Sequence, residues 1–131
     1  MGRIDTFKKY HGQAISNGLL KEIENNFFMS RHAQEQLSER SDFIVKFDDG
    51  RINFGATKQN IKNAMDKNIL AYFNTDGSVN VALDEQHYFV FAWNDERDSW
   101  TMITYKEPSW FSINIFEKQK MALEGFDRQY D

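Results

Sequence analysis

The sequence predicts an α+β fold: N-terminal helices, then a three- or four-stranded antiparallel meander with helices packed on one face, then a C-terminal helix. Two observations predict this order. Apolar residues recur at helical spacing in segments before residue 69, and they alternate with period two from residue 70 to residue 106. Short segments rich in Asn, Asp and Gly separate the alternating segments, as in consecutive hairpins.

The N-terminal segment, residues 1–28, predicts interrupted helical structure. Its apolar residues follow helical steps, but Gly12 and Gly18 weaken the middle, so we expect one broken helix or two short ones. Ser30 is a good N-cap for the next helix, which should end near Arg40.

Residues 43–55 contain Asp49-Gly50 between apolar residues, a pattern that predicts either a hairpin or an ordered loop. We expect Thr57 to cap a further helix and Asn68 to end it. One stripe of this helix would face the core, and it consists of Ile61, Ala64, Met65 and Ile69.

The meander follows this helix. Residues 74–78 predict a turn between two short strands, and residues 94–98 predict a charged turn before the last strand. Residues 87–93 are apolar on both faces, which is typical of a central strand. A last helix is expected between Asn114 and Gly125, because its start resembles a capping box.

Composition limits the function classes. A chain of 131 residues with 40% hydrophobic residues suffices for one domain, residues 1–131, with a single core. Its 12 Phe, 5 Tyr and 3 Trp can build that core or stack on nucleobases, and the alternating strand patterns favour the core. A net charge of −4 argues against non-specific nucleic-acid binding, although a local basic patch can exist on an acidic protein.

Cofactor, metal and membrane sites are not predicted. The chain has no cysteine, its 3 histidines lack metal-ligand spacing, and no glycine-rich phosphate loop is present. No apolar run approaches the roughly 18 residues that span a bilayer, and the N-terminus lacks the apolar stretch of a signal peptide. We therefore expect a soluble, cytoplasmic protein.

A first candidate site lies on the helix after Ser30. His32, Gln36 and Arg40 follow at four-residue steps, so they share one stripe, while Ala33 and Leu37 would face the core. If the stripe faces a groove, His32 can exchange a proton and Arg40 can hold a phosphate. The alternative is an ordinary solvated helix face.

A second candidate group closes the last strand. Alternation puts Thr104 and Lys106 on one face and Tyr105 on the other. Polar residues at a strand end occur in binding sites and equally at sheet edges, where lysine discourages aggregation. Imidazole, guanidinium, phenol and ammonium groups are nevertheless able to bind or cleave a phosphodiester.

Together these segments resemble a known group of proteins. The pattern His32-Ala33-x-x-x-Leu37-x-x-Arg40, a helix, a meander and the closing Ile103-Thr104-Tyr105 resemble the RelE/BrnT-like small toxin-type domains. The resemblance covers residues 29–107, with residues 1–28 as a helical extension and residues 108–131 as a C-terminal helix and tail. It implies a metal-independent ribonuclease, in which the ribose 2′-hydroxyl attacks the adjacent phosphate with help from acid–base groups and cations.

The resemblance also implies site residues. By matching position these are His32, Arg40, Thr104 and Tyr105, and we add Lys106 from its neighbourhood. The chain departs from the group in three respects. Gln36 stands where the motif prefers arginine, the chain is acidic, and the link after the motif helix is lengthened. These departures bear on catalysis more than on the fold.

Two function hypotheses from different classes remain open. An RNA-cleaving enzyme, with RNA as substrate and an antitoxin as partner, predicts that His32, Arg40 and Lys106 converge on one concave, positive surface. A non-catalytic acidic module of a phage or plasmid would instead bind a target protein through carboxylates. Those carboxylates are Glu22, Glu24, Glu35, Glu39, Asp48, Asp49, Asp95, Glu96 and Asp98. Under either hypothesis, Trp110-Phe111 anchors a partner or packs against the last helix.

Overall fold

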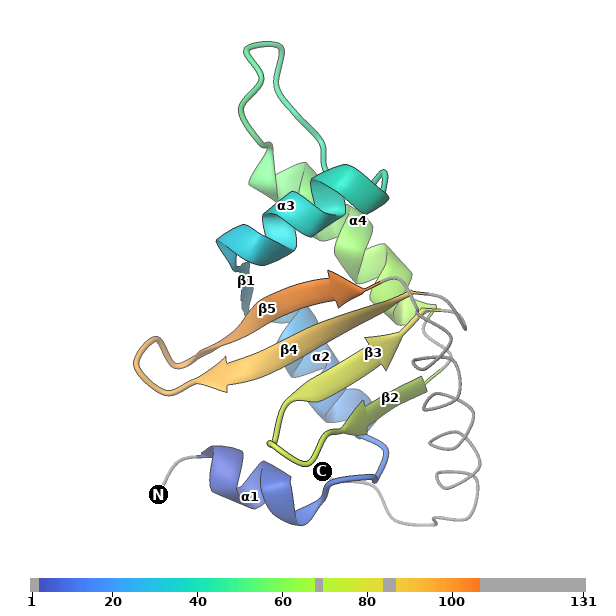
Figure 1. The fold of residues 1–131 in the computed structure, drawn as a ribbon, viewed down its shortest axis with the longest axis vertical. Helices are drawn as coiled ribbons and strands as arrows, with labels where there is room; N and C mark the ends of the chain where they lie inside the picture. Colours follow the sequence, from blue (N-terminus) through green and yellow to red (C-terminus); the bar gives the residue numbers. More distant parts are fainter. Residues whose placement is uncertain (1–2, 68–69, 84–86, 107–131) are drawn as a thin grey trace.

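The computed structural model describes residues 3–67, 70–83 and 87–106 (Figure 1). The elements are α1 (Arg3–Lys9), α2 (Asn17–Asn25), β1 (Phe27–Met29), α3 (Arg31–Arg40), α4 (Phe54–Asp66), β2 (Leu70–Phe73), β3 (Val79–Ala82), β4 (Tyr88–Asn94) and β5 (Ser99–Lys106). The expected C-terminal helix and the pair Trp110-Phe111 lie outside the described residues, as do Asn68 and Ile69. No helix in the described ranges is long and apolar enough to cross a membrane.

The sheet corrects the predicted meander. Its strand order is β1-β5-β4-β3-β2, and β2 to β5 form the expected antiparallel meander. A fifth strand, β1, pairs in parallel with β5, with Phe27 opposite Trp100, so the sheet is mixed and five-stranded. The sequence did not reveal β1 because three residues are too few to show alternation, and Phe27 also continues the helical spacing of α2.

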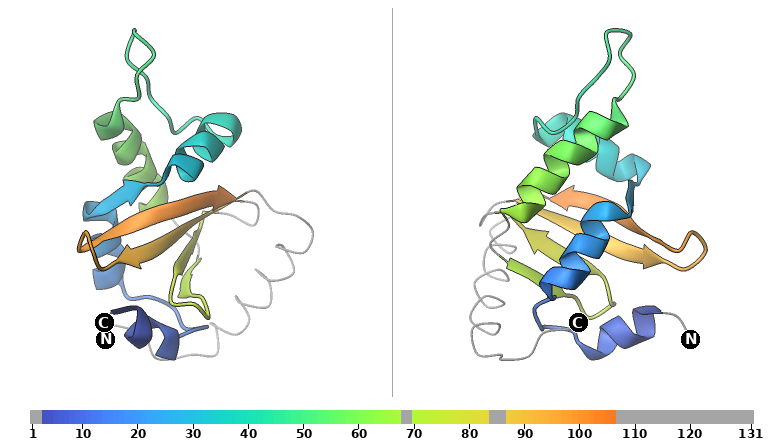
Figure 2. Two further views of the ribbon diagram at one scale, coloured as in Figure 1. Left: turned by 60° about the vertical axis from the view of Figure 1, so that its left-hand side comes forward. Right: turned by 180° about the vertical axis from the view of Figure 1, so that it is seen from behind.

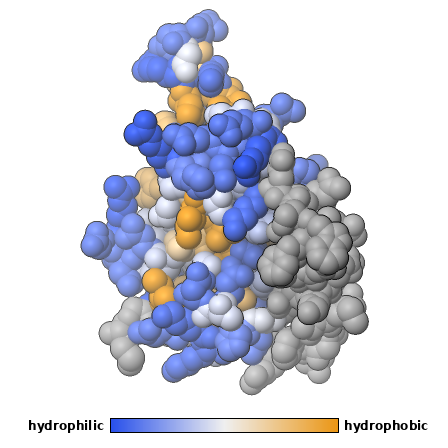
Figure 3. Space-filling view, viewed as in Figure 1, coloured by the Kyte–Doolittle hydropathy of each residue, from blue (hydrophilic) through white to orange (hydrophobic). Residues whose placement is uncertain are grey.

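Helices α2 and α4 cover one face of the sheet, which we call the inner face (Figure 2). Along β4, the expected central strand, Phe89, Phe91 and Trp93 are buried on this face. Val90 and Ala92 alternate with them and are half-buried on the opposite, outer face. The outer face shows a narrow apolar strip between hydrophilic residues (Figure 3).

The helices before the sheet largely follow the expected caps. The N-terminal segment forms two short helices, and Ser30 caps α3 by accepting a hydrogen bond from the Ala33 N–H at 3.0 Å. Helix α4 begins earlier than expected because Asn53, not Thr57, is its N-cap and accepts from the Ala56 N–H at 3.1 Å. Thr57 is buried instead, and its hydroxyl oxygen accepts from the Val45 N–H at 2.9 Å.

The segment between α3 and α4 is an ordered loop with one hairpin-like step. It forms a single antiparallel bridge between Lys46 and Ile52. Gly50 adopts a φ of 88°, a conformation that glycine reaches without the Cβ strain of other residues. The hairpin and the ordered loop predicted for Asp49-Gly50 are thus each confirmed in part, because the turn forms but no paired strands flank it.

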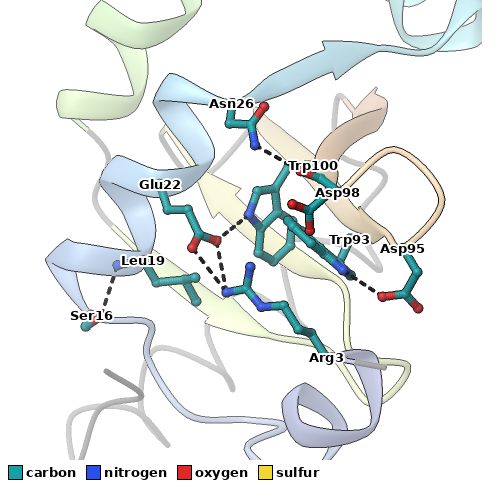
Figure 4. Close-up of polar contacts among 9 residues, drawn as sticks. All are labelled: Arg3, Ser16, Leu19, Glu22, Asn26, Trp93, Asp95, Asp98 and Trp100. Carbon is teal, nitrogen blue, oxygen red and sulfur yellow. Dashed lines mark hydrogen bonds and ion pairs between the residues drawn. The ribbon is translucent and has the colours of Figure 1, made fainter. Parts of the chain in front are cut away.

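Helix α1 joins the same core as the sheet. The Phe7 ring stacks on Phe73 and Trp100, with centroids 5.2 and 5.4 Å apart. The Arg3 guanidinium lies 4.3 Å from the centroid of the Trp93 ring and pairs with the Glu22 carboxylate at 3.0 Å (Figure 4). The Trp100 indole N–H donates to the same carboxylate at 2.8 Å. Residues before position 29 therefore share one hydrophobic cluster with the rest of the chain.

Candidate functional site

Hydrogen bonds join helix α3 to the end of strand β5. Gln36 Oε1 accepts hydrogen bonds from the Tyr105 N–H, at 3.0 Å, and from the Thr104 hydroxyl. At the other end of the helix, the Ser30 hydroxyl donates to the Ile103 carbonyl at 2.9 Å. Gln36 thus acts as an acceptor, a role that an arginine at this position cannot fill because it carries only donors.

The end of β5 presents its residues to two faces, as alternation predicts. Tyr105 lies opposite Phe89 on the inner face and is buried. Thr104 lies opposite Val90 on the outer face, and Lys106 lies opposite Tyr88. A bulge leaves Ile103 without a partner on β4 and exposes it.

The residues proposed from the sequence are not brought to one surface. Arg40 and Tyr105 line one cavity, whereas Lys106 lines a different one. His32 is exposed near the start of α3, eight residues or about 12 Å of helix rise from Arg40. The expected convergence of His32, Arg40 and Lys106 is therefore wrong, because helix rise separates the first two and strand alternation turns the third away.

The first cavity, which we call the Arg40 cavity, has a volume of about 670 Å³ between the end of α3, the second half of α4 and the strand ends. Its lining is Arg40, Ser41, Asp42, Phe43, Asn60, Asn63, Ala64, Lys67, His87 and Tyr105. Four segments far apart in the sequence thus place an imidazole, a guanidinium, an ammonium and a phenol around one space.

Aromatic contacts fix the wall of the Arg40 cavity. The His87 ring lies parallel to the Tyr105 ring, with centroids 5.9 Å apart and an interplanar angle of 9°. The Phe43 ring meets Tyr105 edge-on at 6.0 Å, and the Asn60 amide donates to the Phe43 carbonyl at 3.1 Å. The imidazole is therefore held against a buried phenol ring, and the loop after α3 is tied to α4.

The charges of the Arg40 cavity favour an anion. Arg40 and Lys67 are exposed, and neither forms an ion pair within the part of the chain that the structure describes. Asp42 is the one carboxylate among the described residues that line it. Among these residues, two cations against one carboxylate leave a net positive charge, which suits a phosphate.

Sequence reasoning missed His87, Lys67 and the two asparagines. The sequence predicts only that His87 begins a central strand. The available signal was the polar stripe of Asn60, Asn63 and Lys67 at three- and four-residue steps along α4. That stripe does not reveal which residues lie opposite it, because the facing side chains come from β4 and β5.

The carboxylates proposed for a protein-binding surface are divided among separate contacts. Glu22 pairs with Arg3, and Glu24 pairs with Lys21. Two more form ion pairs in other parts of the molecule, namely Glu35 with Arg31 and Asp49 with Arg51. Within the described ranges, no group of three or more His, Cys, Asp or Glu residues is arranged to hold a metal ion.

Comparisons with known proteins add no relative: no family model matches the chain, and no curated protein or solved structure matches it significantly. The resemblance to RelE/BrnT-like domains therefore stays a prediction.

Proposed function

We propose that this chain binds RNA in the Arg40 cavity and cleaves it by attack of a ribose 2′-hydroxyl on the adjacent phosphate. One observation carries the proposal: Arg40, Lys67, His87 and Tyr105 line the same cavity, and the described residues of its lining have a net positive charge. These groups are those that phosphodiester transesterification needs, namely a proton acceptor and cations that stabilise the crowded phosphate.

The proposed roles follow from position. The His87 imidazole takes the proton of the 2′-hydroxyl, and the 2′-oxygen forms a bond to phosphorus while the bond to the 5′-oxygen breaks. The leaving oxygen takes a proton from water, and His87 then returns its proton to solvent. Arg40 and Lys67 stabilise the added negative charge on the phosphate. Tyr105 is a positioning residue, because its ring holds the imidazole.

The competing module hypothesis receives less support. It requires carboxylates gathered on one surface, whereas four of those named from the sequence form ion pairs on α2, on α3 and in the loop after α3. Protein-partner binding without RNA cleavage remains the alternative outcome of the experiment that follows.

The experiment is a cleavage assay on mixed single-stranded RNA in the presence of EDTA. We expect 2′,3′-cyclic phosphate ends from the native protein, and losses of about 10²- to 10⁴-fold for His87→Ala. For Arg40→Ala we expect about 10²- to 10³-fold. His32→Ala and Arg31→Ala are the matched controls, because both residues are exposed on α3 outside the cavity lining.

Cleavage that survives the two controls but not the two cavity variants supports the proposal. If the native protein leaves RNA intact, or if His32→Ala abolishes cleavage while His87→Ala does not, the proposal is wrong.

A further inference from the structure

A second cavity lies on the outer face of the sheet, and we call it the Tyr72 cavity. Its volume is about 630 Å³, within the range of small-molecule sites. Tyr72, Asn80, Tyr88 and Val90 come from three neighbouring strands and share the outer face, since Tyr72 pairs with Asn80 and Asn80 with Val90. Lys106 lies at its rim, opposite Tyr88.

The polar groups of the Tyr72 cavity are fixed by one another. The Asn80 amide N–H donates to the Tyr72 hydroxyl oxygen at 2.9 Å, and Asn80 Oδ1 accepts from the Asn74 amide at 2.6 Å. Asn74 also donates to the Ser78 hydroxyl at 2.9 Å, and Ser78 donates to Asp76. Because the Asn80 side-chain amide contacts both the Tyr72 hydroxyl and the Asn74 amide nitrogen, these two groups lie near each other.

Two polar atoms of this network have capacity left for a ligand. Tyr72 is only 7% exposed, and within the described residues its hydroxyl proton has no acceptor. Burial raises the pKa of Tyr72, so the hydroxyl keeps its proton and stays a donor. The side-chain oxygen of Asn74, Oδ1, likewise has no donor among the described residues. A nearly buried hydroxyl without an acceptor is costly unless something binds it.

The charges inside the Tyr72 cavity disfavour a phosphate beside Asp76 and leave the cation at the rim. Asp76 lies in the lining, and hydrogen bonds from Ser78 lower its pKa, so it is a carboxylate at neutral pH. Lys106, which has no ion pair within the described ranges, balances that charge at the rim. His11 also lines the cavity. The backbone beside it is fixed, because the Gly12 N–H donates to the Phe73 carbonyl at 2.8 Å.

We propose that the Tyr72 cavity binds one nucleobase of an RNA, with the Tyr72 hydroxyl and the side-chain oxygen of Asn74 reading its hydrogen-bonding edge and Lys106 contacting a phosphate. A flat heterocycle with adjacent acceptor and donor atoms matches the fixed polar pair, and Val90 offers it an apolar floor. That the ligand is RNA rests on the proposed function.

The two cavities are neighbours along the chain. His87 and Tyr105 line the Arg40 cavity, and the next residues, Tyr88 and Lys106, line the Tyr72 cavity. A base bound on the outer face would thus lie across the same strand ends from the proposed cleavage site. Base preference thus belongs to the outer face, and the chemistry belongs to the Arg40 cavity.

The test is an NMR titration with the four ribonucleoside 5′-monophosphates and with ribose 5-phosphate as the base-free probe. We expect the His11 ring signals to shift, and at least one nucleotide to bind more tightly than ribose 5-phosphate. Tyr72→Phe should weaken the preferred nucleotide about tenfold, the effect of one hydrogen bond, and reduce the preference among bases. Lys106→Ala should weaken all four nucleotides about equally.

Thermal unfolding shows whether Tyr72→Phe is folded. Lys106 is exposed, so Lys106→Ala should fold normally and tests the phosphate contact independently of Tyr72. Equal binding of ribose 5-phosphate and nucleotides, or an unchanged preference in folded Tyr72→Phe, would overturn the inference. His32→Ala, a change outside both cavity linings, should bind nucleotides normally. Nucleotide binding without RNA cleavage would refute only the proposed function, and cleavage without nucleotide binding would refute only the base site.

Discussion

The inner and outer faces of the sheet differ in how they use their residues. On the inner face, Phe73, Phe91 and Trp100 are fully buried and pack against other rings. On the outer face, Tyr72 and Asn80 form hydrogen bonds with each other and border a cavity. Apolar burial on the inner face thus stabilises the fold, whereas the outer face carries fixed polar groups with hydrogen-bonding capacity left for a ligand.

Neighbouring residues on one strand provide the sharpest contrast. Phe91 is fully buried on the inner face, and Val90 is half-buried on the outer face. We expect Phe91→Ala to lower the free energy of unfolding by about 3–5 kcal/mol, because it removes a ring and leaves a cavity. Val90→Ala should cost about 1 kcal/mol, since fewer buried groups are lost. Urea unfolding measures both, and equal losses would contradict the division between the faces.

The link between α3 and β5 gives the next largest effect. Gln36→Ala leaves the Tyr105 N–H and the Thr104 hydroxyl without their acceptor, so we expect a loss of about 1–3 kcal/mol. Gln36→Glu keeps an acceptor and is the matched control, with a smaller loss. Gln36→Arg should resemble the alanine variant. If urea unfolding shows that Gln36→Arg is as stable as the native protein, Gln36 is not a structural acceptor.

The smallest expected change in stability comes from Glu24, a buried carboxyl on α2, the helix that covers the inner face. Burial raises the pKa of Glu24 on α2 above its usual 4.5, with the nearby Asp66 as a second cause. The stabilisation of the folded state by protonated Glu24 is present below pH 4.5 and is lost as pH rises through the raised value.

Glu24→Gln should therefore melt at an increasingly higher temperature than the native protein as the pH rises from 4 to 8. Glu35→Gln, on exposed α3, is the control and should show no such trend. Asp66 has the opposite dependence, because hydrogen bonds from Lys21 and then from Glu24 lower its pKa, and the amide introduced by Glu24→Gln can still donate to it. A constant difference between Glu24→Gln and the native protein at every pH would refute the assignment.

Local signals predicted much of the fold. The Ser30 cap, the buried Ala33 and Leu37 and the central position of β4 are confirmed, because each depends on short-range periodicity or capping. The prediction that phenylalanines build the core is confirmed for five of them, namely Phe7, Phe27, Phe73, Phe89 and Phe91. Phe28, Phe47 and Phe54 are exposed instead.

Contacts between segments far apart in the sequence could not be predicted from local patterns. Strand β1 is defined by pairing with β5, more than seventy residues later. The Arg40 cavity likewise depends on how α4 lies against β4 and β5, so His87 gave no signal of its own. Residue chemistry suggested phosphate binding, but only the fold shows which of the suggested residues share a space.

The 3 histidines of the chain lie in three different places, two in the cavities and one on α3, so their NMR signals distinguish these sites. His87 lines the Arg40 cavity, His11 lines the Tyr72 cavity, and His32 is exposed on α3. The most direct measurement is the NMR signals of these rings during titration with a 2′-O-methyl RNA, which can bind but cannot be cleaved. The account predicts that the His87 signals shift and the His32 signals do not. A shift of His32 with an unchanged His87 would contradict it.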